Sequence, residues 1–137
     1  MRDRKVLRAV CAAAACLLLS CCVKPASYEE FIRADEATGG LYSFTLDMAD
    51  SLCTYDISFY TADDDLQAEG LPVYVVWTGP GSESFEELVY MKPDETIQPY
   101  RTGLVMSVPG EWKLDLRPME VPEGFRGIGV ICKRKEL

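Results

Sequence analysis

The residues that could do chemistry in this chain are thiols and carboxylates, because its 137 residues include six cysteines and 22 acidic side chains but no histidine. The absence of histidine excludes Ser-His and Cys-His nucleophilic arrangements and most zinc sites. No glycine-rich loop opens a helical segment, which excludes a phosphate-binding loop of that kind. What remains depends on where the carboxylates and thiols stand.

Two acidic groups have the composition of a functional site but not the spacing. The segment DDDLQAEG at 63–70 offers oxygen ligands for Ca²⁺, yet it lacks the spacing and the turn glycine of an EF-hand loop. Glu86 and Glu87 form a carboxylate pair, but neighbours in a strand point to opposite faces and cannot flank one glycosidic bond. We interpret the first group as a solvated loop and the second as part of a polar edge strand. We therefore predict no catalytic residue, no metal site, no cofactor and no enzymatic activity.

The N-terminal cysteines indicate where the protein is located. Basic residues within 2–8 precede eleven apolar residues at 9–19. Such a run is shorter than the roughly 20 residues of a membrane-spanning helix and is typical of a signal-peptide core. The sequence LLSC at 18–21 then resembles the bacterial lipobox, so we predict a lipoprotein signal peptide over 1–20 and a lipid, of the palmitate type, on Cys21. Plain secretion and a retained buried helix are the alternatives.

The mature chain would be one acidic domain behind a tether. Removal of residues 1–20 leaves 117 residues with 10 basic and 21 acidic side chains, enough for a single domain with its own core. This charge argues against nucleic acid as a partner. Residues 21–40 mix charges with Pro25 and a Gly-Gly break, so we interpret them as lipid anchor and tether, with YEEFIRADEA as a candidate short helix.

From Leu41 onward the hydrophobic pattern has a period of two, which is typical of half-buried strands. PVYVVWT is apolar on both faces and suits a central strand, and the turn signal GPGS joins it to FEELVYM as a hairpin. Residues 41–137 are therefore predicted to form an antiparallel β-sandwich of about seven strands, jelly-roll-like, with an open barrel as the alternative. The expected strands are LYSFTLDM, CTYDISFY, PVYVVWT, FEELVYM, YRTGLVMSV, EWKLDLR and GFRGIGVICK.

The aromatic residues bear on whether such a domain binds sugars. Trp77 lies in the doubly apolar strand and Trp112 alternates with charged residues, so both are expected in the core and not on a sugar-binding surface. The alternation leaves the facing of Tyr60, Tyr90 and Tyr100 open. A stripe of exposed aromatic residues would favour a glycan ligand.

Two features of the last strand suggest further sites. Gly127 and Gly129 share one face, opposite the apolar residues, and glycine inside a strand often marks the close approach of another group. That group is either an aromatic ring of the same chain or the backbone of a partner at an exposed edge. Cys53 and Cys132 both have inward parity, so we expect them close together, either as the domain's disulfide or as two buried free thiols.

Several of these segments together resemble a known family. YSFTLDMADSLCTYDISFY, LPVYVVWTGP, GEWKLDL and FRGIGVICKRKE are similar to the GldH family of gliding-motility lipoproteins of the Bacteroidota. The likeness covers about residues 28–135. It implies a lipobox, a short tether, a β-sandwich and a non-enzymatic accessory role in gliding or in the associated secretion system.

The sequence thus favours a lipid-anchored, non-enzymatic lipoprotein that binds another envelope protein. A glycan-binding outer-membrane lipoprotein is the alternative. In the family, surface-exported lipoproteins carry an acidic run after the lipidated cysteine, whereas this chain has CVKP at 22–25. The resemblance therefore implies attachment to the outer membrane on its periplasmic face.

Overall fold

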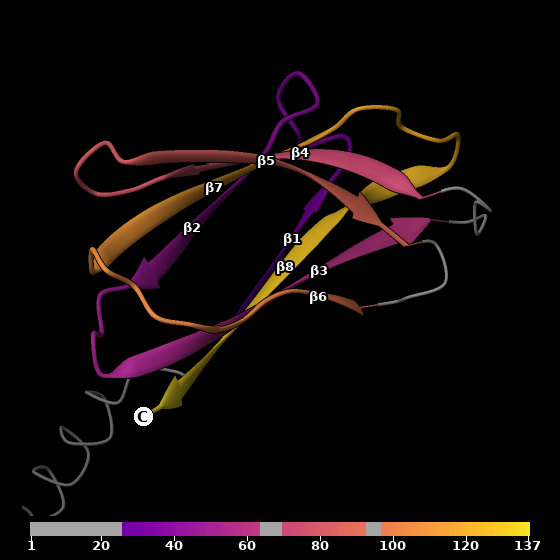
Figure 1. Ribbon diagram of the computed structural model, residues 1–137. Coiled ribbons are helices and arrows are strands. Elements are labelled where there is room, and N and C mark those ends of the chain that lie inside the picture. The colour runs from indigo at the N-terminus through magenta and orange to yellow at the C-terminus, as the bar shows by residue number, and fades with distance from the viewer. Residues whose placement is uncertain (1–25, 64–69, 93–96) are drawn as a thin grey trace, which may run out of the picture.

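The structure is a computed structural model that describes residues 26–63, 70–92 and 97–137. Eight strands form two antiparallel four-stranded sheets packed face to face, as Figure 1 shows. The strands are β1 (Ser27–Arg33), β2 (Tyr42–Met48), β3 (Cys53–Asp63), β4 (Leu71–Thr78), β5 (Ser84–Met91), β6 (Ile97–Leu104), β7 (Gly110–Pro118) and β8 (Phe125–Glu136). The predicted antiparallel sandwich is confirmed, with eight strands where about seven were expected.

The order of strands is that of a jelly roll. One sheet runs β1-β8-β3-β6 and the other runs β2-β7-β4-β5. Only β4 and β5 are joined as a hairpin within one sheet, and every other connection crosses between the sheets. The edge strands β1 and β2 therefore flank one side of the sandwich, and the edge strands β5 and β6 flank the other (Figure 1).

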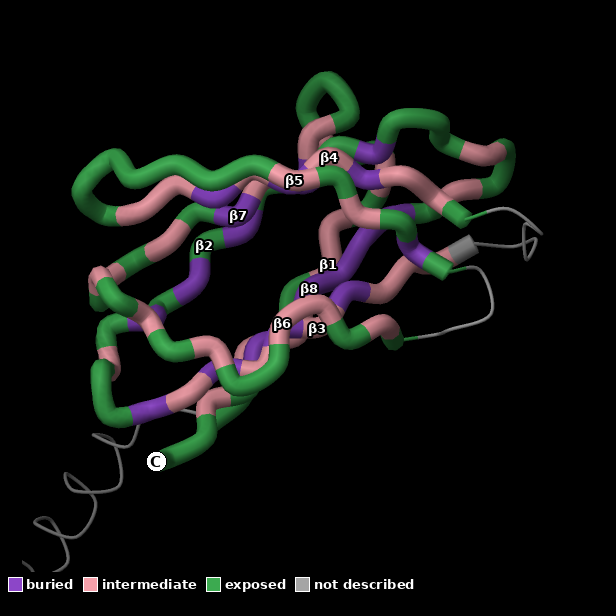
Figure 2. The backbone as a smooth tube through the Cα atoms, in the orientation of Figure 1, coloured by how far each residue is buried: buried purple, intermediate pink, exposed green. Residues whose placement is uncertain are grey.

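The core lies between the sheets and consists of the inward residues of each alternating strand. β2 has the burial pattern expected of a strand with one buried face, with every second residue buried. Figure 2 shows that buried residues recur along the strands of both layers. The largest fully buried side chains are Phe44, Phe59, Leu46, Met48, Ile57, Leu114, Leu116, Ile128, Val73, Val75 and Val130. Trp77 is buried and Trp112 packs against this core, as their parity predicted.

The prediction for residues 21–40 is wrong in part. The segment proposed as a short helix within the tether contains β1, which pairs over all its seven residues with β8. Phe31 and Ile32 are neighbours and so point to opposite faces, and both are partly buried. The segment lacks alternation because an apolar residue packs on each face of β1: Phe31 stacks on Tyr60 outside, and Ile32 packs against the core inside. The sandwich therefore begins near residue 27 instead of residue 41.

The signal peptide, Cys21 and most of the acidic segment 63–70 lie outside the described residues. Within the described ranges, no helix is long and apolar enough to cross a membrane.

Candidate functional site: the β5–β6 side of the sandwich

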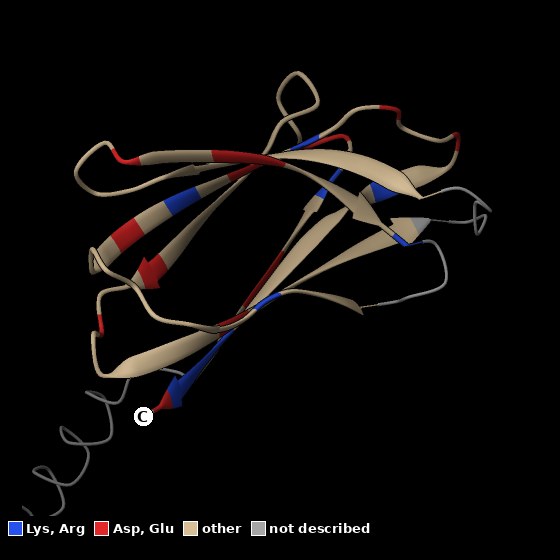
Figure 3. Cartoon of the chain, in the orientation of Figure 1, with Lys and Arg blue, Asp and Glu red and all other residues tan. Residues whose placement is uncertain are grey.

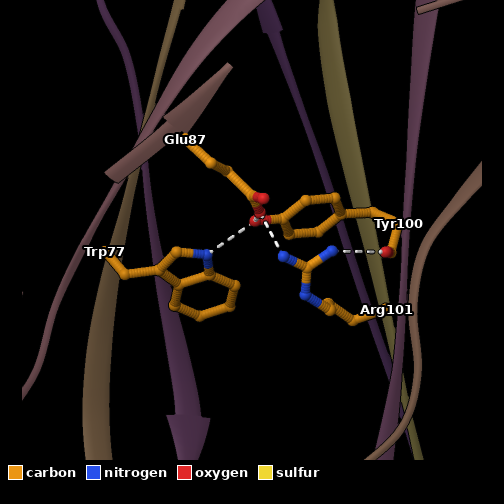
Figure 4. A network of polar contacts seen from close by, with 4 residues as sticks. All are labelled: Trp77, Glu87, Tyr100 and Arg101. Carbon is orange, nitrogen blue, oxygen red and sulfur yellow. Dashed lines mark hydrogen bonds and ion pairs between the residues drawn. The ribbon is translucent and has the colours of Figure 1, made fainter. Parts of the chain in front are cut away.

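The side of the sandwich flanked by β5 and β6 holds a polar network that joins the two sheets. Glu87 on β5 points inward, because its partner in the ladder is the buried Val75. Tyr100 on β6 donates a hydrogen bond from its hydroxyl to the Glu87 carboxylate, and Arg101 forms an ion pair with the same oxygen (Figure 4). The indole Nε1 of Trp77 donates to the Tyr100 hydroxyl at 3.0 Å. A continuous chain of donors and acceptors thus ties the edge strand of one sheet to the edge strand of the other.

An aromatic row supports this polar bridge from the core side. The Tyr100 ring stacks on Phe59, with centroids 4.4 Å apart, and on Trp77 at 6.3 Å. Trp77 in turn meets Trp112 edge to face. The Arg101 guanidinium carbon lies 4.3 Å from the Tyr100 ring centroid, within range of a cation–π contact. Tyr100, whose facing the sequence left open, is therefore the centre of the site.

The bridge changes the acid–base behaviour of its members. Burial, reinforced by the hydrogen bond to Glu87, raises the pKa of the Tyr100 hydroxyl well above its usual range. Burial would raise the pKa of Glu87, but hydrogen bonds from Tyr100 and Arg101 outweigh burial and hold it below the ordinary 4.5. Glu87 is therefore ionised and Tyr100 protonated near neutral pH. The Glu87 carboxylate is thus a fixed acceptor for two donors, the Tyr100 hydroxyl and the Arg101 guanidinium, and such an arrangement suits holding two strands together.

Among the described residues, β5 is an edge strand with no strand paired on its outer side. The Gly79 N–H donates to Glu83 O within the hairpin, so odd-numbered residues of β5 direct their main-chain groups toward β4. Even-numbered residues direct theirs away from β4. In the part of the chain that the structure describes, no hydrogen bond reaches the main chain of Glu86 or Leu88 from that free side.

The same strand also exposes apolar side chains. Phe85, Leu88 and Tyr90 are 51%, 48% and 62% exposed. Glu86 shares the outer face of the sheet with Leu88 and Tyr90, whereas Phe85 has the inward parity of its ladder partner Trp77. Glu86 accepts a hydrogen bond from Tyr74, and Figure 3 shows the acidic band on β5. The other edge strands differ: β6 carries Pro99 and two register shifts, while β1 and β2 expose no large hydrophobic side chain. An unbroken edge with exposed apolar residues is unusual, because it is a template for pairing.

The opposite side of the sandwich has a cavity of about 270 Å³. Its lining comes from both sheets and includes Tyr28 of β1, Leu46 of β2 and Cys132 of β8. The Tyr28 hydroxyl donates to Glu30 and does not bridge to the other sheet. The Tyr28 hydroxyl therefore does not play the part on this side that the Tyr100 hydroxyl plays between β5 and β6.

The predicted proximity of Cys53 and Cys132 is wrong, although both are buried as expected. Both thiols are free. The ladder pairs Cys132 with Ile57, four residues along β3 from Cys53. At 3.3 Å per residue this offset is about 13 Å, whereas a disulfide needs Cα atoms within about 7 Å. The alternation correctly predicted that both side chains point inward. It could not predict the register of β3 against β8, which decides how far apart the two cysteines lie along the strands.

The proposed partner edge at Gly127 and Gly129 is also wrong, because β8 is an interior strand between β1 and β3. The groups that approach belong to the same chain: the Tyr60 ring at Gly129, and the main chain of β1 together with the Phe31 ring at Gly127. A Cβ on Gly129 would lie 2.1 Å from Cζ of Tyr60, and one on Gly127 would lie 2.8 Å from Cζ of Phe31. The two rings lie 5.8 Å apart and nearly parallel on the outer face of the sheet. Tyr60 donates to Glu29 at 2.9 Å, and burial together with this bond raises its pKa to about 12.

The carboxylate predictions have a mixed outcome. Glu86 and Glu87 do point to opposite faces of an edge strand, as predicted. The bridging role of Glu87 was missed, because its partners Tyr100 and Arg101 lie 13 and 14 residues away on the other sheet. Within the described residues, no group of three or more potential ligands could hold a metal ion.

Comparisons with known proteins bear on the fold. No family model matches the chain, and no curated protein matches it. Among solved structures, the crystal structure of GEBA250068378 from Sulfurospirillum deleyianum is similar, with a TM-score of 0.53 and 8% sequence identity. The match covers 83% of this chain and 100% of that one. At this identity the likeness shows the sandwich fold alone.

Proposed function

We propose that this chain is a lipid-anchored, non-enzymatic lipoprotein of the cell envelope that works by binding another envelope protein. The anchor is a lipid on Cys21, and the non-acidic segment CVKP at 22–25 supports attachment at the periplasmic face of the outer membrane. The resemblance to gliding-motility lipoproteins assigns it an accessory role in gliding or in the associated secretion system.

The observation that carries this proposal is the β5 edge. It combines eight residues in unbroken register with β4, three exposed apolar side chains, and outward main-chain groups at Glu86 and Leu88 that have no hydrogen bond within the described part of the chain. Large exposed apolar groups beside an open edge are a common means of binding a protein partner. The internal bridge at Glu87 supports this reading, because it holds β5 in place without occupying its outer edge.

A glycan-binding lipoprotein is the second candidate, and one observation favours it. Phe31 and Tyr60 form a stacked, nearly parallel pair of rings on the outer face of the β1-β8-β3-β6 sheet, with the Glu29 carboxylate beside them. Aromatic rings paired with a polar group suit amphipathic ligands such as sugars. The same two rings also pack over Gly127 and Gly129, so they contribute to the packing of the sheet as well.

The anchor and the binding activity are tested separately. Metabolic labelling with a fatty acid should mark the wild-type chain and leave Cys21→Ala unlabelled; a labelled Cys21→Ala variant would place the anchor elsewhere.

For the binding activity, cross-linking in intact cells followed by purification should recover an envelope protein with the wild type. A double substitution, Phe85→Ser with Leu88→Ser, should lose it at equal folded amount, and Ile97→Ser on the neighbouring edge is the matched control. Retention on a polysaccharide column that Tyr60→Ala abolishes, without recovery of a protein, would overturn the protein-binding proposal in favour of the glycan one.

A further inference from the structure

We propose that β5 takes up an extended segment of its partner as a fifth strand of the β2-β7-β4-β5 sheet, and that this segment carries a basic residue two positions from an apolar one. This inference rests on the proposed function and specifies the chemistry of the partner.

The direction of the main-chain groups shows which part of β5 is available. Two hydrogen bonds at the end of β5 establish this direction independently of the Gly79–Glu83 bond in the hairpin. The Gln98 side chain accepts from the Lys92 N–H at 2.7 Å and donates to the Tyr90 carbonyl at 3.1 Å. Both groups belong to even-numbered residues, so the free side of β5 carries the main-chain groups of Glu86, Leu88 and Tyr90.

Gln98 also shows that this edge accepts a peptide-like group. One amide bridges the carbonyl of residue 90 and the N–H of residue 92, which is the pattern a residue of a parallel neighbouring strand makes. The side chain therefore closes the C-terminal end of the edge. A partner strand is left with residues 84–88, where no hydrogen bond from the described ranges reaches the outward main-chain groups of Glu86 and Leu88.

The side chains at this stretch determine what the partner must carry. Glu86 and Leu88 share the outer face of the sheet, two residues apart, and Glu86 is exposed. Residues directly opposite in neighbouring strands interact, and opposite charges there are favourable. A basic residue opposite Glu86 and an apolar one opposite Leu88 match both positions.

Charge argues against a second copy of this chain as the occupant. Each copy carries a net charge of −8, and pairing two β5 strands would bring acidic edges together. Like charges on facing strands are destabilising. The partner is therefore a different protein with a basic, apolar extended segment.

The test uses the full chain in detergent and capped synthetic peptides, followed by amide hydrogen exchange resolved by residue. The peptides are Ser-Thr-Lys-Thr-Leu-Thr and Ser-Thr-Leu-Thr-Lys-Thr, which match parallel and antiparallel pairing, and controls with Glu in place of Lys. One lysine peptide should slow exchange of the Glu86 and Leu88 amides at least about tenfold at saturation, whereas the Val89 amide, directed toward β4, stays protected throughout. The glutamate peptides should have no effect, and Glu86→Lys should reverse the preference.

Leu88→Pro gives the sharpest variant, because proline removes an N–H that faces the free edge and leaves the ladder with β4 intact. Its matched control, Leu88→Ala, keeps that N–H and loses only the side chain. We expect Leu88→Pro to abolish peptide binding and Leu88→Ala to weaken it about tenfold or less, with both variants retaining cooperative unfolding.

Three results would overturn the inference: equal effects of lysine and glutamate peptides, no protection of Leu88 at peptide concentrations up to about 5 mM, or protection that grows with protein concentration alone, which would identify a second copy as the occupant. The failure of this inference is distinguishable from failure of the proposed function. If Leu88→Pro still captures the envelope partner, the strand-pairing mode is wrong and the function stands. If peptides protect Leu88 but no envelope protein is captured in cells, the function is wrong and the edge chemistry stands.

Discussion

The two sides of the sandwich are closed by different chemistry. On the β5–β6 side, Tyr100 and Glu87 join the sheets through a polar bridge backed by stacked rings. On the β1–β2 side, a cavity of about 270 Å³ separates them, and the Tyr28 hydroxyl turns to Glu30 on its own strand. The bridge acts from inside the sandwich, so it can stabilise β5 while leaving the outer edge of that strand available.

The largest expected effect comes from removing the ring at the centre of the bridge. Tyr100→Ala deletes the stacking on Phe59 and Trp77 and leaves the Trp77 N–H without its acceptor, so we expect a loss of about 3–5 kcal/mol in the free energy of unfolding. Tyr28→Ala, on the side with the cavity, should cost only about 1–2 kcal/mol. Urea denaturation measures both.

Tyr100→Phe separates the stacking from the hydrogen bonds, and we expect it to cost about 1–2 kcal/mol. Equal losses in the free energy of unfolding for Tyr100→Ala and Tyr28→Ala would show that the two sides of the sandwich do not differ in stability.

Gly127→Ala tests what holds β1 at the side with the cavity. A Cβ there would lie 2.2 Å from the Ile32 carbonyl oxygen, at a residue with a φ of 153°. The main chain of β1 would have to move, so we expect a loss of about 2–3 kcal/mol and faster amide exchange along β1.

Gly103→Ala is the matched control, because its φ is 65° but nothing lies within 4 Å of the added carbon. It should cost about 1 kcal/mol, from backbone strain alone. Equal losses in the two variants would show that the contact with β1 contributes nothing.

The difference between the two sides also marks what the sequence could predict. Alternation identified β2, β3 and β7 because each has one apolar and one polar face. It failed for β1, where Phe31 covers a glycine on the outer face and Ile32 faces the core, so that each face of the strand mixes polar and apolar residues. The bridge could not be predicted for a different reason. Glu87 and Tyr100 meet because β5 and β6, edge strands of different sheets, lie one above the other. The local hydrophobic pattern does not reveal this order of strands. One signal for Glu87 was present in the sequence: it is the polar residue among the alternate positions of β5 that are otherwise apolar, Phe85, Val89 and Met91.

A smaller effect should follow the charge of Glu87. Its folded-state pKa lies below the ordinary 4.5, so the ionised carboxylate stabilises the fold above about pH 4.5 and this contribution is lost as the pH falls through the folded-state value. The side chains of Arg101 and Glu87 are 37% and 24% exposed, so solvent screens the pair. We expect Glu87→Gln to lower stability by about 1 kcal/mol at pH 7, and the difference from wild type to shrink below pH 4.5. A difference that stays constant from pH 7 to pH 3 would show that the charge is not what Glu87 contributes.

The smallest effect concerns the thiols. Cys53 and Cys132 are free, and their register places them about 13 Å apart along the strands. A disulfide closing so long a loop would contribute about 4 kcal/mol, and reduction would remove it. We therefore expect dithiothreitol to leave the urea midpoint of the wild type unchanged, and Cys132→Ala to cost about 1 kcal/mol equally with and without the reductant. Burial raises the Cys132 pKa to about 11, so this thiol should also react slowly with small thiol reagents at pH 7, although it lines the cavity. A midpoint that falls on reduction only when both cysteines are present would mean that β3 and β8 pair in another register, and the side with the cavity would then have a covalent closure of its own.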